Sequence, residues 1–159
     1  MRYMKYMRNL EIPLAELYTY ISQAEKLNNK ISSVNVGWHI EHTLLVIQKI
    51  SESVIKSDED MYKWKFNMPR LLVFQLNKFP RGKAKAPNIV IPIQTGKTDF
   101  DLLFSKTRSI IEELKNTLPN QYFIHPIFGM LNKKHTFIML DIHTKHHILI
   151  IKDILSTVQ

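Results

Sequence analysis

Two histidines in the C-terminal part of the chain have the spacing of a metal-binding pair. In His143-Thr144-Lys145-His146-His147, the first and last residues lie four apart, which puts both side chains on one face of a helix. Two imidazoles so arranged can bind one metal ion, as in the H-E-x-x-H zinc proteases. Those enzymes carry a general-base glutamate after the first histidine, where this chain has Thr144. The pattern therefore indicates metal binding without protease chemistry, or two histidines that are only solvated or hydrogen-bonded.

The surroundings of this pair favour the metal. A helix is expected from Lys133 to about Val158, capped by Asn132, and its apolar stripe is formed by Leu140, His143, His147, Ile151, Ile154 and Val158. Unpaired polar rings inside such a stripe would be costly. A second pair, His39 and His42, lies near the start of another expected helix. One ligand from that pair would complete the three-ligand set of an open catalytic site.

Three further helices must position these residues. The first is expected from about Ile12 to Leu27, with Pro13 at its first helical position. The second runs from about Asn35 to Lys56, with Ser33 or Asn35 as its cap. The third runs from Asp99 to about Leu118, with Thr98 and Asp101 as a pair resembling a capping box.

A long connection, residues 57–97, separates the second and third of these helices. It contains a short helical segment, Pro69 to Phe79, followed by an irregular basic loop. Connections of this length usually carry function. Four helices with one long crossover predict an all-α fold, a four-helix bundle.

Composition narrows the class of protein. The chain has 159 residues, of which 45% are apolar and 23% charged, as in a single soluble domain that spans residues 1–159. The absence of cysteine excludes a disulfide scaffold, a cysteine-ligated metal site and a cysteine nucleophile. The net charge of +8 makes anionic partners plausible. Neither a signal peptide nor a membrane helix is recognisable, so a cytoplasmic protein without membrane contact is expected.

Three segments resemble the DinB-like (YfiT-like) metalloenzyme family. His143 to His147 fits the family's His-x-x-His-His pattern, although Ile148 to Ile150 replace its frequent Arg-Gly-Gln continuation. Val34 to His42 resembles its second-helix motif, with Val34 and Asn35 in place of Trp and Ser and with His42 at the histidine position. His125-Pro126-Ile127-Phe128-Gly129-Met130-Leu131 resembles a segment of one branch of unknown function.

The resemblance implies an up-down-down-up bundle with a divalent ion (zinc, nickel, iron or manganese) held by His42, His143 and His147. Some relatives are S-transferases or isomerases that use bacillithiol, mycothiol or glutathione. We therefore expect a metal-dependent enzyme that acts on a small molecule, by thiol-dependent S-transfer or by isomerase or hydrolase chemistry. A low-molecular-weight thiol is its expected co-substrate.

Other residues receive roles around that site. Arg81 and Lys83 of the basic loop and His125 are candidates for substrate binding, although His125 also fits a role in bracing its turn. Asp141, Glu41 and Asp153 are candidates to orient the ligand rings. His39 and His146 are expected to be hydrogen-bonded or exposed rings, and His135 is expected to be exposed.

Three other functions remain open from the sequence. A bundle with a structural metal site, or a protein-interaction module without metal, would need no enzyme activity. The basic residues from Lys78 to Lys85, with Phe74 and Phe79 nearby, have the character of a single-strand nucleic-acid surface, although a solvated loop is the more common meaning of such a run. Dimers are common among such bundles, so a homodimer is an open expectation.

Overall fold

The chain is mostly helical. The computed structural model describes residues 2–80, 90–92 and 98–156, with the backbone alone for residues 2–9. Its long helices are α1 (Arg2–Thr19), α2 (Val36–Ile55), α4 (Phe100–Lys115) and α5 (Lys133–Ser156), and a short helix, α3 (Met68–Leu76), lies between α2 and α4 in the sequence. The structure is thus mostly helical, as the expected all-α class requires, and it also contains a small two-stranded sheet.

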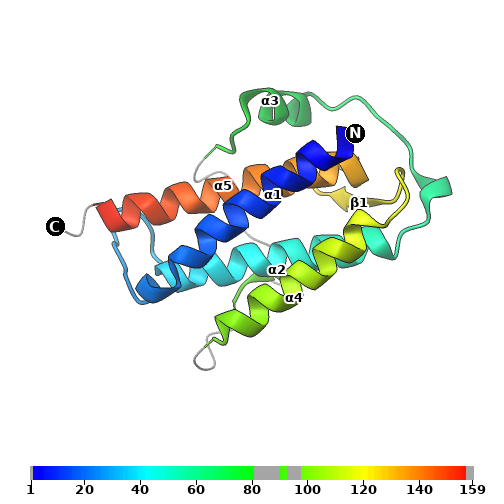
Figure 1. The fold of residues 1–159 in the computed structure, drawn as a ribbon. Coiled ribbons are helices and arrows are strands. Elements are labelled where there is room, and N and C mark those ends of the chain that lie inside the picture. The colour runs from blue at the N-terminus through cyan, green and yellow to red at the C-terminus, as the bar shows by residue number, and fades with distance from the viewer. Residues whose placement is uncertain (1, 81–89, 93–97, 157–159) are drawn as a thin grey trace.

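The long helices pack through a shared core. α2 contacts both α4 and α5, and α1 contacts α5, while the short α3 lies at one edge of the molecule (Figure 1) and contacts α5. Buried side chains of all four long helices and of the sheet form one hydrophobic cluster. Leu140, Ile151 and Ile154 of the predicted apolar stripe on α5 are buried. Because His143 and His147 belong to the same stripe, they lie where α5 contacts α2.

The first helix differs from the expectation at both ends. α1 runs through Pro13 rather than beginning there, so the expected N-terminal position of this proline is wrong. Leu10 is fully buried one turn before Leu14, and this packing outweighs the hydrogen bond that an internal proline forfeits. The helix ends at Thr19, well before Leu27, and a single 3-10 turn (Ile21–Gln23) follows it.

The other helix starts depend on short polar caps. The Asn35 side chain accepts a hydrogen bond from the Trp38 amide at 2.9 Å, so Asn35 rather than Ser33 is the cap of α2. Asn132 accepts one from the His135 amide at 3.1 Å, which confirms the predicted cap of α5. At α4 the cap is Asp99, which accepts from the Leu102 amide. The expected pairing of Thr98 with Asp101 is wrong, because the Thr98 hydroxyl donates to Glu41 at 2.7 Å instead.

A β-hairpin, where only a turn was expected, lies directly before α5. Strands β1 (Tyr122–His125) and β2 (Gly129–Asn132) pair antiparallel, with His125 opposite Gly129. Gly129 has a φ of +70°, a conformation that glycine adopts without steric cost. Each strand has only four residues and the turn contains Pro126, so the sequence offers no run of alternating residues that would reveal it.

A buried arginine helps to fix α3 to this hairpin. Asn67 caps α3, and Asn77 ends it in the left-handed conformation. The Arg70 guanidinium donates to the carbonyl oxygens of Lys65, Phe128 and Met130. These bonds hold α3 against the hairpin, so helix and hairpin together form one side of the region described next.

Candidate metal centre

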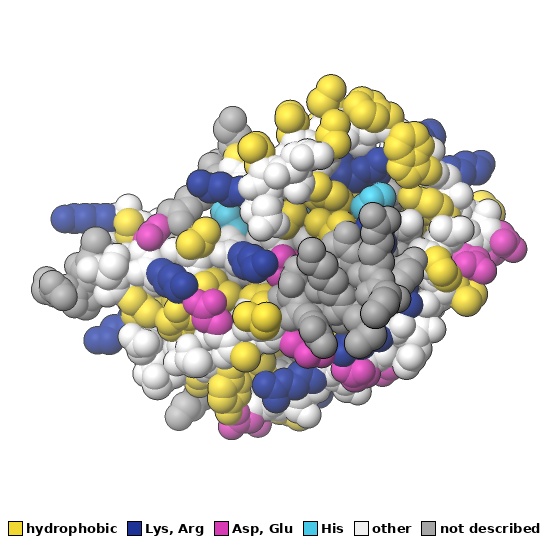
Figure 2. All heavy atoms as spheres, turned by 45° about the horizontal axis from the view of Figure 1, so that its top comes forward, with side chains coloured by type: hydrophobic (Ala, Val, Ile, Leu, Met, Phe, Trp, Pro, Cys, Tyr) yellow, Lys and Arg dark blue, Asp and Glu magenta, His cyan; other side chains and the backbone are white. Residues whose placement is uncertain are grey.

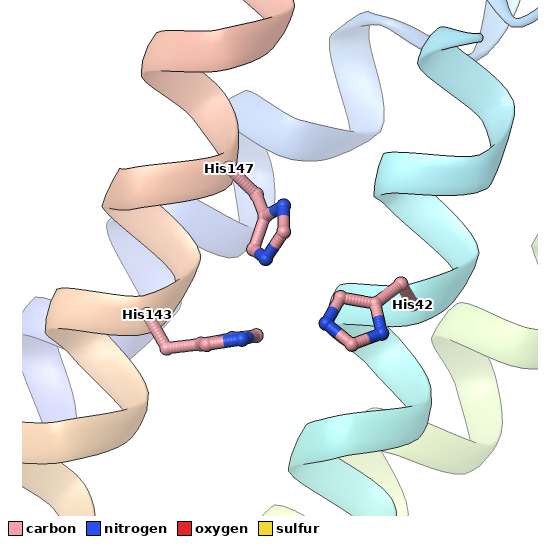
Figure 3. A group of neighbouring side chains, drawn as sticks. All are labelled: His42, His143 and His147. Carbon is pink, nitrogen blue, oxygen red and sulfur yellow. The ribbon is translucent and has the colours of Figure 1, made fainter. Parts of the chain in front are cut away.

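Three histidine side chains converge between α2 and α5. One nitrogen atom from each of His42, His143 and His147 lies within 4.8 Å of the other two. Figure 3 shows the three rings around a common space, with His42 extending from α2 and the other two extending from successive turns of α5. Bonds of about 2.0–2.1 Å to one zinc ion would draw these nitrogen atoms closer together. The structure thus brings together all three residues that were predicted as metal ligands.

Helix geometry accounts for the convergence. The four-residue spacing of His143 and His147 puts both rings on one face of α5. His42 extends from α2 toward that face, and Trp38, one turn earlier on α2, stacks on its ring with a centroid separation of 4.8 Å and an interplanar angle of 12°. His42 and His147 are only 4% and 8% exposed, so these rings cannot rely on water for their hydrogen bonds.

A backbone carbonyl of the crossover orients the ring of His42. Nδ1 of His42 lies 2.7 Å from the Val90 carbonyl oxygen. A carbonyl can only accept a hydrogen bond, so Nδ1 carries the proton. The neutral ring then keeps the lone pair of Nε2 for a metal ion. Nothing in the sequence around Val90 indicates this contact, because it joins residues 48 positions apart.

Another buried histidine, His39, orients the ring of His147. Nδ1 of His39 lies 3.0 Å from Nδ1 of His147, and Nε2 of His39 lies 3.0 Å from the Ser32 hydroxyl. If His147 donates its Nδ1 proton to His39, and His39 donates its Nε2 proton to Ser32, every one of these contacts is satisfied and Nε2 of His147 is left for a metal. His39 is hydrogen-bonded, as expected, but nothing in its sequence context indicates a role as partner of a ligand ring.

Burial keeps these rings neutral. It lowers the pKa of His42 and lowers the pKa of His143 and His147 well below the usual value, and the other histidines nearby lower the last two further. Burial also lowers the pKa of His39 to about 4, and neighbouring histidines act in the same direction. Neutral imidazoles are the form that binds metal.

The donor set fits a divalent ion. Nδ1 of His143 is buried and has no hydrogen-bond partner among the described residues, a state that is costly unless something binds there. Imidazole ligands suit zinc, nickel and iron. Three neutral ligands leave the charge of such an ion uncompensated, and leave room for a further ligand.

The other predicted site residues have mixed outcomes. Nδ1 of His125 accepts from the backbone amides of Ile127 and Phe128 at 3.1 and 3.2 Å, so this ring braces the turn, and it also lines the cavity beside the three histidines. Arg81 and Lys83 lie outside the described residues. The partners of the His42 and His147 rings are Val90 and His39 rather than any of the three candidate carboxylates.

Two of those carboxylates have other partners. Asp141 pairs with Lys145 at 2.6 Å, and Glu41 accepts from Thr98. His146 lines the cavity with its ring against Phe79. The expected exposure of His135 is wrong, since its Nδ1 is buried and its ring packs against Phe74.

The three histidines lie on the wall of a large cavity between α2, α3, α5 and the hairpin. Its volume is about 1510 Å³, and its wall is mostly apolar. In Figure 2 hydrophobic side chains gather in the upper part of the view, and histidine side chains are visible from this side. A small molecule that enters the cavity would meet the candidate metal centre.

Comparisons of the chain with known protein families, with curated proteins and with solved structures gave no match. Within the described ranges, no helix is both long and apolar enough to cross a membrane.

Removing the hydrogen-bond partner of His147 should weaken metal binding. In His39→Phe the new ring fills a similar space but cannot accept the Nδ1 proton, and we expect zinc affinity to fall about 10–100-fold, as for other residues that support metal ligands. His39→Asn restores an acceptor near the same position and should bind nearly as tightly as the parent. Competition with a chromophoric chelator measures both variants. Equal affinity for the parent and His39→Phe would show that His39 does not support the site.

The metal-free protein should lose stability as the pH falls below 6.5. Burial, with Arg70 and Lys134 nearby, lowers the pKa of His135 to about 4. Between the usual pKa of 6.5 and the folded-state pKa of about 4, His135 is protonated in the unfolded chain but not in the folded one. The free energy of unfolding is therefore highest above pH 6.5 and falls as the pH drops toward 4. His135→Phe should flatten this decline, by less than the ~1.4 kcal/mol per pH unit of one full proton, because solvent reaches part of the ring. Urea unfolding at several pH values measures the slope, and identical slopes would contradict the prediction.

Proposed function

We propose that this protein is a divalent-metal-dependent enzyme that acts on a small molecule, with His42, His143 and His147 as its metal ligands. The observation that carries the proposal is the convergence of three neutral imidazoles, two of them buried and one half-buried, on the wall of a large cavity. A purely structural metal site would not require a cavity of this size beside it. The His-x-x-His-His pattern further supports membership of the DinB-like family and the up-down-down-up bundle of four helices.

The chain's own residues supply orientation and exclude water. Val90 and His39 fix two of the rings, and the apolar wall limits the water around a bound substrate. When bound, a divalent ion would act as a Lewis acid and lower the pKa of a coordinated water or thiol. Zinc, nickel, iron and manganese all remain candidates.

A low-molecular-weight thiol is the co-substrate we propose. Such thiols carry carboxylates, and Lys49, Lys56 and Lys78 lie along the cavity with Glu52 as the acidic member of the wall. This excess of positive charge favours an anionic co-substrate. S-transfer is then the leading reaction, with isomerisation or hydrolysis as the alternatives at the same site.

The metal ligands are tested by elemental analysis of tag-free protein. We expect close to one divalent ion per chain in the parent and loss of that ion in His42→Ala, His143→Ala and His147→Ala. The matched control is His135→Ala, which removes a histidine outside the cluster and should retain the metal. Failure of the parent to bind zinc, nickel, iron or manganese after reconstitution would contradict the site.

The thiol is tested by turnover. Metal-loaded protein should consume bacillithiol, mycothiol or glutathione in the presence of a panel of small electrophiles, and His143→Ala should not. Stoichiometric metal without thiol consumption on any electrophile would overturn S-transfer. A stable metal site without any turnover would favour the non-enzymatic metal-binding alternative.

A further inference from the structure

The cavity has the wall of a site for an apolar ligand. Leu72, Val73 and Leu76 of α3 line it on one side, and Val46 and Ile50 of α2 line it on the other. Apolar residues of the hairpin line a third side: Phe123, Ile124, Pro126, Ile127 and Phe128. Its volume of about 1510 Å³ exceeds the range of about 300–1,000 Å³ that is usual for small-molecule sites. Burial of apolar surface therefore supplies the main driving force for any ligand here.

One polar group on this wall has a fixed hydrogen-bonding direction. Nδ1 of His125 accepts from two backbone amides, those of Ile127 and Phe128. Backbone amides can only donate, so Nδ1 carries no proton and the neutral ring has its proton on Nε2. The ring cannot rotate without losing both bonds, and its stacking on Phe128 at a centroid distance of 4.3 Å holds its plane. His125 thus presents a single N–H donor on the side of the ring away from the turn.

This donor belongs to the wall of the same cavity as the metal centre, and it has no partner of its own among the described residues. Among the described residues Nε2 of His125 has no hydrogen-bond partner. His125 and the three candidate ligands line the same cavity, and the charge of His125 would influence His143. In a mostly apolar wall, an unused donor at a fixed position selects for a ligand with a matching acceptor, because a ligand without one would bury this donor with no partner, which is costly.

We propose that the cavity binds an apolar small molecule bearing a carbonyl oxygen, and that Nε2–H of His125 holds this oxygen beside the three histidines. His125 is a substrate-positioning residue in this arrangement, and the apolar wall holds the remainder of the molecule. The assignment names the substrate class of the proposed enzyme and in that sense rests on the proposed function. Ligand binding itself does not require the metal.

The test compares two ligands of nearly the same shape. 2-Acetylnaphthalene carries a carbonyl oxygen, and 2-isopropylnaphthalene carries a methyl group in its place. We expect the parent protein, freed of metal by chelation, to bind both and to hold the ketone by a hydrogen bond. Binding is followed by naphthalene fluorescence and, independently, by calorimetry.

Two variants of His125 separate ligand binding from bracing of the turn. His125→Asn keeps an acceptor close to the position of Nδ1 and lacks the distal donor. It should raise the dissociation constant of the ketone about tenfold relative to that of the hydrocarbon. His125→Gln places a donor near the position of Nε2 and should preserve most of the parent's preference. If His125 only braces the turn, His125→Gln should lower both the folding stability and the affinity for the ketone, and His125→Asn should leave both nearly unchanged.

Each outcome is decisive. A tenfold relative loss in His125→Asn, with retention in His125→Gln, supports the proposal. Unchanged relative affinities in His125→Asn, or no binding of either ligand to the parent, overturns it. Metal content is measured on the same samples before chelation, so that failure of the metal centre is recognised separately from failure of the carbonyl site.

Discussion

The packing of α2 against α5 is the contact on which the rest of the site depends. It places His39 and His42 of one helix against His143 and His147 of the other, in a region where three of these rings are less than one-tenth exposed. Polar rings in such a place destabilise the fold unless each nitrogen atom has a partner. The structure provides protein partners for one nitrogen of His42 and of His147, and both nitrogens of His39. One nitrogen atom from each of His42, His143 and His147 lies within 4.8 Å of the other two, which is the arrangement that a metal ion would satisfy.

The histidine cluster and the cavity beside it are built from segments that are distant in the sequence. Val90 comes from the crossover, Ser32 from the connection between α1 and α2, and His125 from the hairpin before α5. Arg70 holds α3 to that hairpin, and α3 supplies one wall of the cavity. The crossover therefore does more than connect α2 to α4, because it orients a ligand ring and encloses the space in front of it. Its length is consistent with such a role.

Periodicity and capping predicted the parts that depend on local sequence. The apolar stripe of α5 placed His143 and His147 on the buried face, and Asn35 and Asn132 marked the starts of α2 and α5. The choice of His42 over His39 came from a family resemblance, and in the structure both residues take part, in different ways. The contacts of Val90 and Ser32 could not be predicted, because each depends on where a loop lies in three dimensions. The hairpin was missed because its strands are too short to show alternation, and the upstream extension of α1 was missed because Pro13 resembled a helix start.

The most direct test of the account is the position of a bound ion. Crystals of the zinc-loaded protein, measured at the zinc absorption edge, should show one anomalous peak from a zinc ion. This ion should be bonded to Nε2 of His42, Nε2 of His147 and a ring nitrogen of His143. The hydrogen bonds from His42 to Val90 and between His147 and His39 should persist with the ion in place. A peak elsewhere, or an ion bound through Nδ1 of His42 or of His147 with those hydrogen bonds broken, would contradict the central claim that the fold orients these rings for a metal.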